Sequence, residues 1–235
     1  SGANTPPRSR GGAGKPQTSD GDMPPTATVD TTRLWKSDDP AEWRKALDAY
    51  PARLASLNDP KLLELDAWFW GSLGAAIRAR DPRHLTAQEL VRVVEWKLAR
   101  GKFRPNLVKF ARAHTEAIAG EATGEALARF AKTSGDEDEN WLAACLAPLV
   151  SLKGIGPATA SAVLAAATAS IPMMSDELIA VALPQATSSQ MYSMPRLQAL
   201  VEATRAKAKK VGVSPREVER AIFAEAARSK KPKAN

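Results

Sequence analysis

Apolar residues recur at intervals of three and four residues along most of the chain. The pattern runs through residues 61–80, 86–100, 105–119, 123–132, 139–150, 158–169 and 215–228. This spacing places the apolar side chains on one face of a helix, whereas strict apolar–polar alternation, which is typical of strands, is missing. We therefore predict an all-α protein built from roughly ten helices.

Local signals mark where several of these helices begin and end. Thr86 with Glu89, and Ser214 with Glu217, have the spacing of a capping box. Asp59 stands before Pro60, which suits an N-cap followed by the first helical residue. Gly101 is the residue type that commonly ends a helix, so the helix from residue 86 is expected to stop near residue 100.

The two ends of the chain differ from the part between them. Residues 1–31 are rich in Gly, Pro, Ser and Thr and have almost no large apolar side chains, so they cannot offset the entropy of ordering. We expect a disordered tail over 1–31, one helical domain over 32–229, and a short basic tail over 230–235.

The charge of the chain is unevenly placed. Its 235 residues include 33 Lys and Arg against 26 Asp and Glu, a net charge of +7. The segment 204–235 has ten basic and three acidic residues and so holds the whole excess. The neutral remainder contains a second basic stretch without an acid, formed by Lys97, Arg100, Lys102, Arg104, Lys109 and Arg112. Such runs are usually solvated helix faces, but two of them favour an acidic partner.

Several kinds of protein are excluded by the composition. Cys145 is the one cysteine, which rules out a disulfide scaffold, a cysteine-rich zinc module and a four-cysteine iron–sulfur cluster within this chain. His84 and His114 lack metal-ligand spacing, so no metal site is expected. No run approaches the roughly 18 apolar residues of a membrane helix, and the N-terminal residues lack the apolar core of a signal peptide. We expect an intracellular protein without a membrane partner.

The segment from Leu152 to Ala160 carries the most specific pattern. It reads Leu-Lys-Gly-Ile-Gly-Pro-Ala-Thr-Ala and joins two predicted helices. Gly154 and Gly156 permit a tight turn with positive φ, and Ile155 between them can pack inward. The amides of the turn and the start of the next helix would form a binding site for an anion such as phosphate. An ordinary glycine turn between helices is the alternative.

The region 141–169 resembles the helix-hairpin-helix DNA-binding motif, in which Leu-Pro-Gly-Val/Ile-Gly precedes a helix with Thr-Ala near its start. Lys153 replaces the usual proline and adds a cation beside the phosphate site. The resemblance implies a DNA partner and no cofactor, except that the hairpin carbonyls could hold a monovalent cation. The residues implied to contact phosphate are Lys153, Gly154, Ile155, Gly156 and Thr159.

The resemblance continues downstream into the helix-hairpin-helix DNA glycosylase superfamily, in its branch without an iron–sulfur cluster. In that family a loop with proline leads to a catalytic Asp at a helix start, and Asp176 stands 20 residues after Gly156. The family's lyase lysine would fall at position 158, which is Ala158 here, so the resemblance implies a monofunctional glycosylase. The alternative is that Asp176 is only an N-cap for the apolar helix that follows.

A second resemblance covers residues 95–105, which are similar to the eukaryotic Amun-type proteins with a DNA-glycosylase-like domain. The two resemblances together would cover residues 33–226. They imply that cations of the second basic stretch, called the inner basic stretch from here on, follow the DNA backbone. These cations are Lys97, Arg100, Lys102 and Arg104.

A glycosylase also needs apolar or aromatic walls for a base that has left the stack. The candidates for these walls are Trp68, Trp70, Trp96, Met173, Met174 and Tyr192, for each of which core packing is the alternative.

These features lead to two hypotheses about function. The first is a nuclear DNA-repair enzyme that removes a modified or mismatched base by hydrolysing its N-glycosidic bond after base flipping. The second is a non-catalytic helix-hairpin-helix module that binds DNA, or acts as an adaptor among other proteins of a nucleic-acid complex. The apolar residues after Asp176 and the missing lyase lysine favour the second, and RNA is a further candidate ligand. The direction of the Asp176 carboxylate relative to the hairpin and the basic stretch separates the two.

Overall fold

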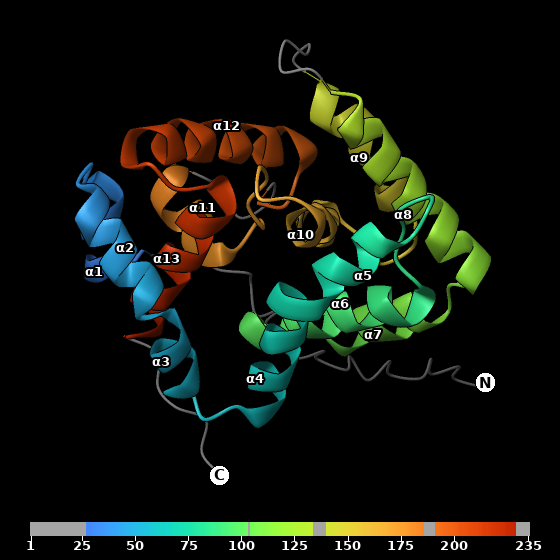
Figure 1. Ribbon diagram of the computed structural model, residues 1–235, viewed down its shortest axis with the longest axis horizontal. Coiled ribbons are helices and arrows are strands. Elements are labelled where there is room, and N and C mark those ends of the chain that lie inside the picture. Colours follow the sequence, from blue (N-terminus) through green and yellow to red (C-terminus); the bar gives the residue numbers. More distant parts are fainter. Residues whose placement is uncertain (1–26, 103, 134–139, 186–190, 229–235) are drawn as a thin grey trace, which may run out of the picture.

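The computed structural model describes residues 27–102, 104–133, 140–185 and 191–228, and every regular element in these ranges is a helix (Figure 1). The predicted all-α class is therefore confirmed. The elements are α1 (Val29–Lys36), α2 (Pro40–Asp48), α3 (Tyr50–Ala55), α4 (Pro60–Ala67), η1 (Trp68–Leu73), α5 (Gly74–Ala79), α6 (Ala87–Arg100), α7 (Pro105–Arg112), α8 (Glu116–Ala131), α9 (Trp141–Val150), α10 (Pro157–Ala167), α11 (Asp176–Ala182), α12 (Met194–Val211) and α13 (Pro215–Ala227). None of these helices combines the length and the apolar composition that crossing a membrane requires.

The predicted capping signals are confirmed. The Thr86 hydroxyl accepts from the Glu89 N–H at 3.1 Å, while the Glu89 carboxylate accepts from the Thr86 N–H at 2.9 Å. Ser214 and Glu217 form the same reciprocal pair at the start of α13. Asp59 caps α4, which begins at Pro60. These contacts involve residues three apart, so the local sequence is enough to predict them.

The structure differs from the predicted elements in three places. Helix α1 begins at Val29, with Thr28 as its cap and Thr31 buried, so the predicted tail extends too far into the domain. Helix α7 ends at Arg112, and α8 then runs without a break from Glu116, because the Thr115 side chain caps it. The helix predicted over 61–80 contains a π-helical turn, η1. Residues 1–26, the acidic run 136–139 and the predicted tail 230–235 lie outside the described residues.

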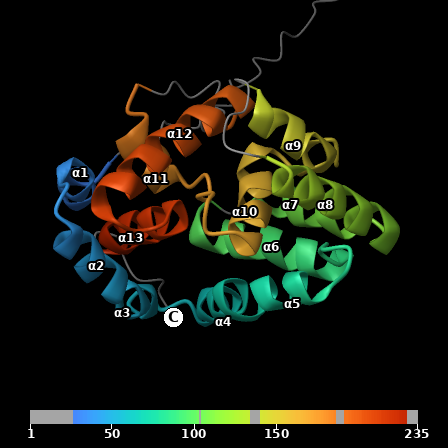
Figure 2. The same cartoon turned by 45° about the horizontal axis from the view of Figure 1, so that its top comes forward.

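The helices form two groups with α10 between them (Figure 2). In one group α13 packs against α1, α2, α3, α11 and α12, and in the other α6 packs against α4, η1, α7, α8 and α10. Helix α10 consists mainly of small, buried residues. A Cβ atom on Gly74 would lie 2.9 Å from the Ala166 carbonyl oxygen, which shows how closely η1 and α5 approach α10. Small side chains thus allow the central helix to have neighbours on all sides.

A buried ion pair connects the two groups. The Arg100 guanidinium, at the end of α6, donates to both carboxylate oxygens of Glu219 in α13, at 2.8 and 3.3 Å. The two side chains are 2% and 0% exposed. The guanidinium also lies 3.9 Å from the centre of the Phe223 ring and 4.9 Å from that of Trp96. Arg100 is therefore surrounded by a carboxylate and two aromatic rings.

The charges of this pair depend on each other. Burial by itself lowers the pKa of Arg100, but the Glu219 carboxylate, with Tyr50 and Asp66, outweighs burial and raises that pKa, so the guanidinium stays charged. Burial raises the pKa of Glu219, against the effects of Arg100 and of the nearby Ser175 hydroxyl. Removing either partner would leave a charge in the interior without compensation.

Replacement of Glu219 by alanine should strongly destabilise the fold. The variant leaves the Arg100 guanidinium buried and unpaired, so we expect a loss of about 3–5 kcal/mol of unfolding free energy, measured by urea denaturation. The control is Glu125→Ala, which breaks the exposed Arg129–Glu125 pair and should cost about 0–1 kcal/mol. Equal losses in the two variants would contradict a structural role for the buried pair.

Candidate functional site

A cavity of about 500 Å³ opens between the two groups of helices. Its walls come from the end of α6, the loop into α7, the hairpin between α9 and α10, the segment that leads into α11, and Tyr192. The predicted site residues that line it are Lys97, Arg100, Lys102, Arg104, Lys153, Gly154, Ile155, Gly156, Thr159, Met173, Met174, Asp176 and Tyr192. The cavity thus brings together the hairpin, the inner basic stretch and Asp176. Lys97 and Asp176 are 79 residues apart in the sequence.

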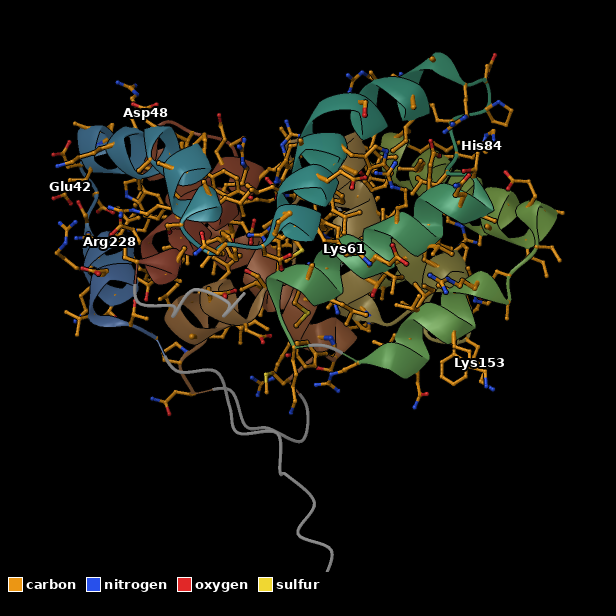
Figure 3. The ribbon with its side chains drawn as sticks, turned by 90° about the horizontal axis from the view of Figure 1, so that it is seen from below. Glu42, Asp48, Lys61, His84, Lys153 and Arg228 are labelled. Carbon is orange, nitrogen blue, oxygen red and sulfur yellow. The ribbon has the colours of Figure 1, made fainter. Side chains whose placement is uncertain are left out.

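The first glycine of the hairpin is required by the fold. Gly154 has φ +85°, and a Cβ atom there would lie 2.6 Å from the Cβ of Phe110. The Lys153 ammonium lies 4.6 Å from the centre of the same ring, and the Lys153 carbonyl is hydrogen-bonded to the His114 ring. Figure 3 shows Lys153 at the outer edge of the molecule. Phe110, which the sequence did not single out, therefore supports the hairpin on α7.

The second glycine is not required by the fold. Gly156 has φ −95° and ψ −179°, an extended conformation open to any residue, so the positive φ expected in this turn is found at Gly154 and not at Gly156. A Cβ atom on Gly156 would have no atom within 4 Å. The residue is exposed and lines the cavity. The missing side chain keeps open a space that no other described part of the protein fills.

Some backbone N–H groups of the hairpin donate hydrogen bonds within the turn and others do not. Ile155 donates to the Leu152 carbonyl and Thr159 to the Gly156 carbonyl, each at 3.0 Å, and both side chains are buried. These two residues therefore shape the turn and do not have a free amide for phosphate. Within the described ranges, the amides of Gly154 and Gly156 donate to no residue. Two amides beside a helix start form a suitable site for an anion.

Asp176 is not the cap of α11. That position belongs to Ser175, whose hydroxyl accepts from the Leu178 N–H at 3.4 Å. The half-buried Asp176 carboxylate lines the cavity and accepts a hydrogen bond from the Tyr192 hydroxyl at 2.5 Å. The loop before it is held by the Ser161 hydroxyl of α10, which accepts from the Met174 N–H at 2.9 Å. Capping therefore does not explain Asp176, which opens into the space shared with the hairpin.

The cations of the inner basic stretch have different surroundings. Lys102 is exposed, Arg104 and Lys97 are half-buried, and all three line the cavity. Burial lowers the pKa of Lys97 and Arg104 lowers it further, while the Asp176 carboxylate opposes this change. The expectation that Arg100 follows a DNA backbone is wrong, because its side chain is buried against Glu219.

The three tryptophans proposed as walls of a base pocket lie outside the cavity. Trp96 is fully buried, and its ring stacks on that of Phe69 with the two ring centres 3.5 Å apart. Its indole N–H donates to the Asp66 carboxylate at 2.9 Å. Trp70 contacts Trp96 edge-on, and Trp68 lies under the Arg92 guanidinium. Core and surface packing thus explain all three. The remaining candidates, Met173, Met174 and Tyr192, do line the cavity.

The described part of the C-terminal basic segment contacts the protein itself. Lys207 pairs with Asp38 at 2.6 Å, and Arg228 pairs with Glu225 at 3.0 Å. Figure 3 places Arg228 and Lys153 at opposite ends of the molecule. Part of the charge of this segment is therefore used in contacts within the fold, while Lys209 stays exposed and the lysines of 230–235 lie outside the described residues.

The described residues contain no group of three or more His, Cys, Asp or Glu side chains that could hold a metal ion. Comparison of the chain with protein-family models, curated proteins and solved structures gave no match. The function proposed below therefore depends on the residues of the cavity.

Alanine substitutions should separate the two glycines of the hairpin. Gly154→Ala imposes positive φ on a side chain and forces its Cβ against Phe110, so we expect a loss of about 2–4 kcal/mol of unfolding free energy. Gly156→Ala should leave that free energy within about 1 kcal/mol of the wild-type value, because its Cβ meets nothing and its φ is ordinary. Chemical denaturation of both variants measures the difference, and a large loss in Gly156→Ala would contradict this account of the hairpin.

Proposed function

We propose that this protein binds DNA through its hairpin and removes a modified or mismatched base by hydrolysis of the N-glycosidic bond. The observation that carries the proposal is that one cavity holds the Asp176 carboxylate, two unbonded glycine amides and several cations. A carboxylate beside a phosphate site is the combination that base removal needs, because the sugar must be held while its C1′ becomes positively charged.

Each part of the cavity has a role in this reaction. The amides of Gly154 and Gly156, with Lys153, hold a phosphate of the strand that carries the target nucleotide. Asp176 stabilises the positive charge that develops on the sugar and orients the attacking water. The Tyr192 hydroxyl holds one oxygen of that carboxylate in place.

The size and the lining of the cavity fit an extruded nucleotide. Its volume of about 500 Å³ falls in the usual range for small-molecule sites. Met173 and Met174 provide an apolar wall that can adapt to a base. The hairpin amides suit phosphate in DNA or RNA, and the resemblance of the hairpin to a DNA-binding motif favours DNA. The resemblance to the eukaryotic Amun-type proteins favours the nucleus as the location of the protein, alone or with other proteins of a DNA-associated complex.

The second candidate function is a DNA-binding module without catalysis. Two observations favour it: the predicted aromatic walls lie outside the cavity, and one Asp176 oxygen is already bonded to Tyr192. Asp176 would then only anchor Tyr192, while the hairpin and the cations bind DNA.

The hairpin should account for DNA binding. Gly156→Ala places a methyl group where phosphate approaches, so we expect weaker binding with little change in stability, measured by fluorescence anisotropy on a labelled duplex. Lys153→Ala should reduce the slope of log affinity against log salt by about one unit. The control is Lys209→Ala, an exposed lysine of α12 outside the cavity, which should bind as the wild type does. Wild-type affinity in both hairpin variants would rule out the hairpin as the DNA site.

Asp176 should be needed for base release and not for binding. The substrates are duplexes that contain uracil, an oxidised purine, an alkylated purine or a mismatched adenine, and alkali converts the abasic product into a strand break. We expect Asp176→Asn to lower the rate on the preferred duplex by about 10²–10⁴-fold, while its affinity stays near that of the wild type. Wild-type protein that binds every duplex and releases no base would favour the non-catalytic module.

A further inference from the structure

Lys97 differs from the other lysines at the cavity. Lys102 and Lys153 are exposed, whereas Lys97, in the last turn of α6, is half-buried and lines the interior with Asp176. Among the described residues, none forms a hydrogen bond or ion pair with its ammonium group. An ion held back from water without a close partner is costly, so its position calls for an explanation beyond packing.

The surroundings of Lys97 act on its pKa in opposite directions. Burial has the largest effect on its pKa and lowers it, and the Arg104 guanidinium, from the start of α7, lowers it further. Asp176, at the start of α11, acts in the opposite direction, yet the pKa stays below the ordinary lysine value. Arg100 lies on the same helix as Lys97, but Glu219 compensates its charge. A lysine whose pKa is lowered has a larger share of the neutral amine, the form that attacks carbonyl carbons.

We propose that Lys97 is a catalytic amine that condenses with the abasic sugar left after base removal and cleaves the strand there, an inference that rests on the proposed function. The Lys97 nitrogen adds to the C1′ aldehyde of the ring-opened sugar. As the C=N bond forms, one proton is taken up and one water leaves. The fold thereby supplies an amine from α6, although position 158, at the start of α10, is alanine.

Strand cleavage follows from this protonated imine. Asp176 takes a proton from C2′, and the electron pair of that C–H bond becomes the C2′=C3′ double bond. The C3′–O bond breaks, and the 3′ phosphate leaves with its electron pair. Water then hydrolyses the imine and restores the Lys97 amine. Every group that this sequence requires is a protein side chain, the sugar or water.

The proposal is tested with a duplex in which an abasic site has been prepared beforehand, so that base release by this protein is not needed. Sodium borohydride reduces the imine to a stable protein–DNA adduct, which is visible as a shifted band on a denaturing gel. We expect an adduct with the wild-type full chain, with the DNA attached to Lys97 by peptide mass spectrometry. The yield should reach half its maximum well below pH ~10.5, the value of an ordinary lysine.

Two variants distinguish an amine nucleophile from a phosphate-binding cation. Lys97→Ala and Lys97→Arg should both lose the adduct, although arginine keeps the charge and should keep duplex affinity. Lys209→Ala, the exposed control outside the cavity, should keep the adduct. Thermal melting of each variant checks that it is folded. An adduct that persists in folded Lys97→Arg, or that maps to another amine, overturns the proposal.

A small probe separates failure of this proposal from failure of the proposed function. The probe 2-deoxyribose 5-phosphate carries the aldehyde and one phosphate, and sodium cyanoborohydride should fix it to Lys97 without any DNA. Labelling at Lys97 supports the amine even if the wild type releases no base from any duplex. No adduct on an abasic duplex that the protein binds overturns the lyase proposal, whether or not base release is found.

Discussion

The walls of the cavity depend on the buried ion pair that the Glu219 carboxylate forms with Arg100. The carboxylate accepts two hydrogen bonds from Arg100, at the end of α6, and it belongs to α13, against which α11 packs. One buried acid therefore binds the wall that carries Lys97 to the helix that supports the wall with Asp176. Because a buried charge without its partner costs several kcal/mol, α6 and α13 cannot separate at this point without a large penalty. Electrostatics, and not apolar packing alone, thus fixes how these two helices sit beside the cavity.

Helix α10 couples the hairpin to Asp176. Its small residues let neighbouring helices approach, and its first turn carries the hairpin whose glycine amides are unbonded. One turn further along, the Ser161 hydroxyl holds the backbone before Asp176 through the Met174 N–H. The same helix therefore positions two glycine amides before its start and a carboxylate beside its first two turns. In the proposed reaction, this link would let a bound phosphate fix a sugar relative to the carboxylate.

The sequence was enough to predict features that depend on near neighbours. The capping boxes at Thr86 and Ser214 and the hairpin with its flanking helices follow from residues a few positions apart. Features that depend on distant residues could not be predicted: Arg100 meets Glu219 across 119 positions, and Trp96 packs on Phe69 in the core. The same stretch therefore contains an exposed Lys102, a half-buried Lys97 and a buried Arg100, because Lys102 lies beyond the end of α6 while Arg100 meets Glu219 of α13.

The cations of the cavity differ in their exposure to water, and the proposals give the exposed Lys153 a role in binding and the half-buried Lys97 a role in chemistry. In the proposed complex, a phosphate held at the hairpin by the Gly154 and Gly156 amides and by the exposed Lys153 would lie at the rim, where water also screens its charge. A phosphate beside Lys97 would instead stabilise its ammonium form, as Asp176 already does in part. In the proposed complex the hairpin amides, which donate to no described residue, would serve a second purpose: because they would bind the anion with dipoles at the rim, the inner lysine would not be its counter-ion. The bound strand would then not reverse the lowering of the Lys97 pKa.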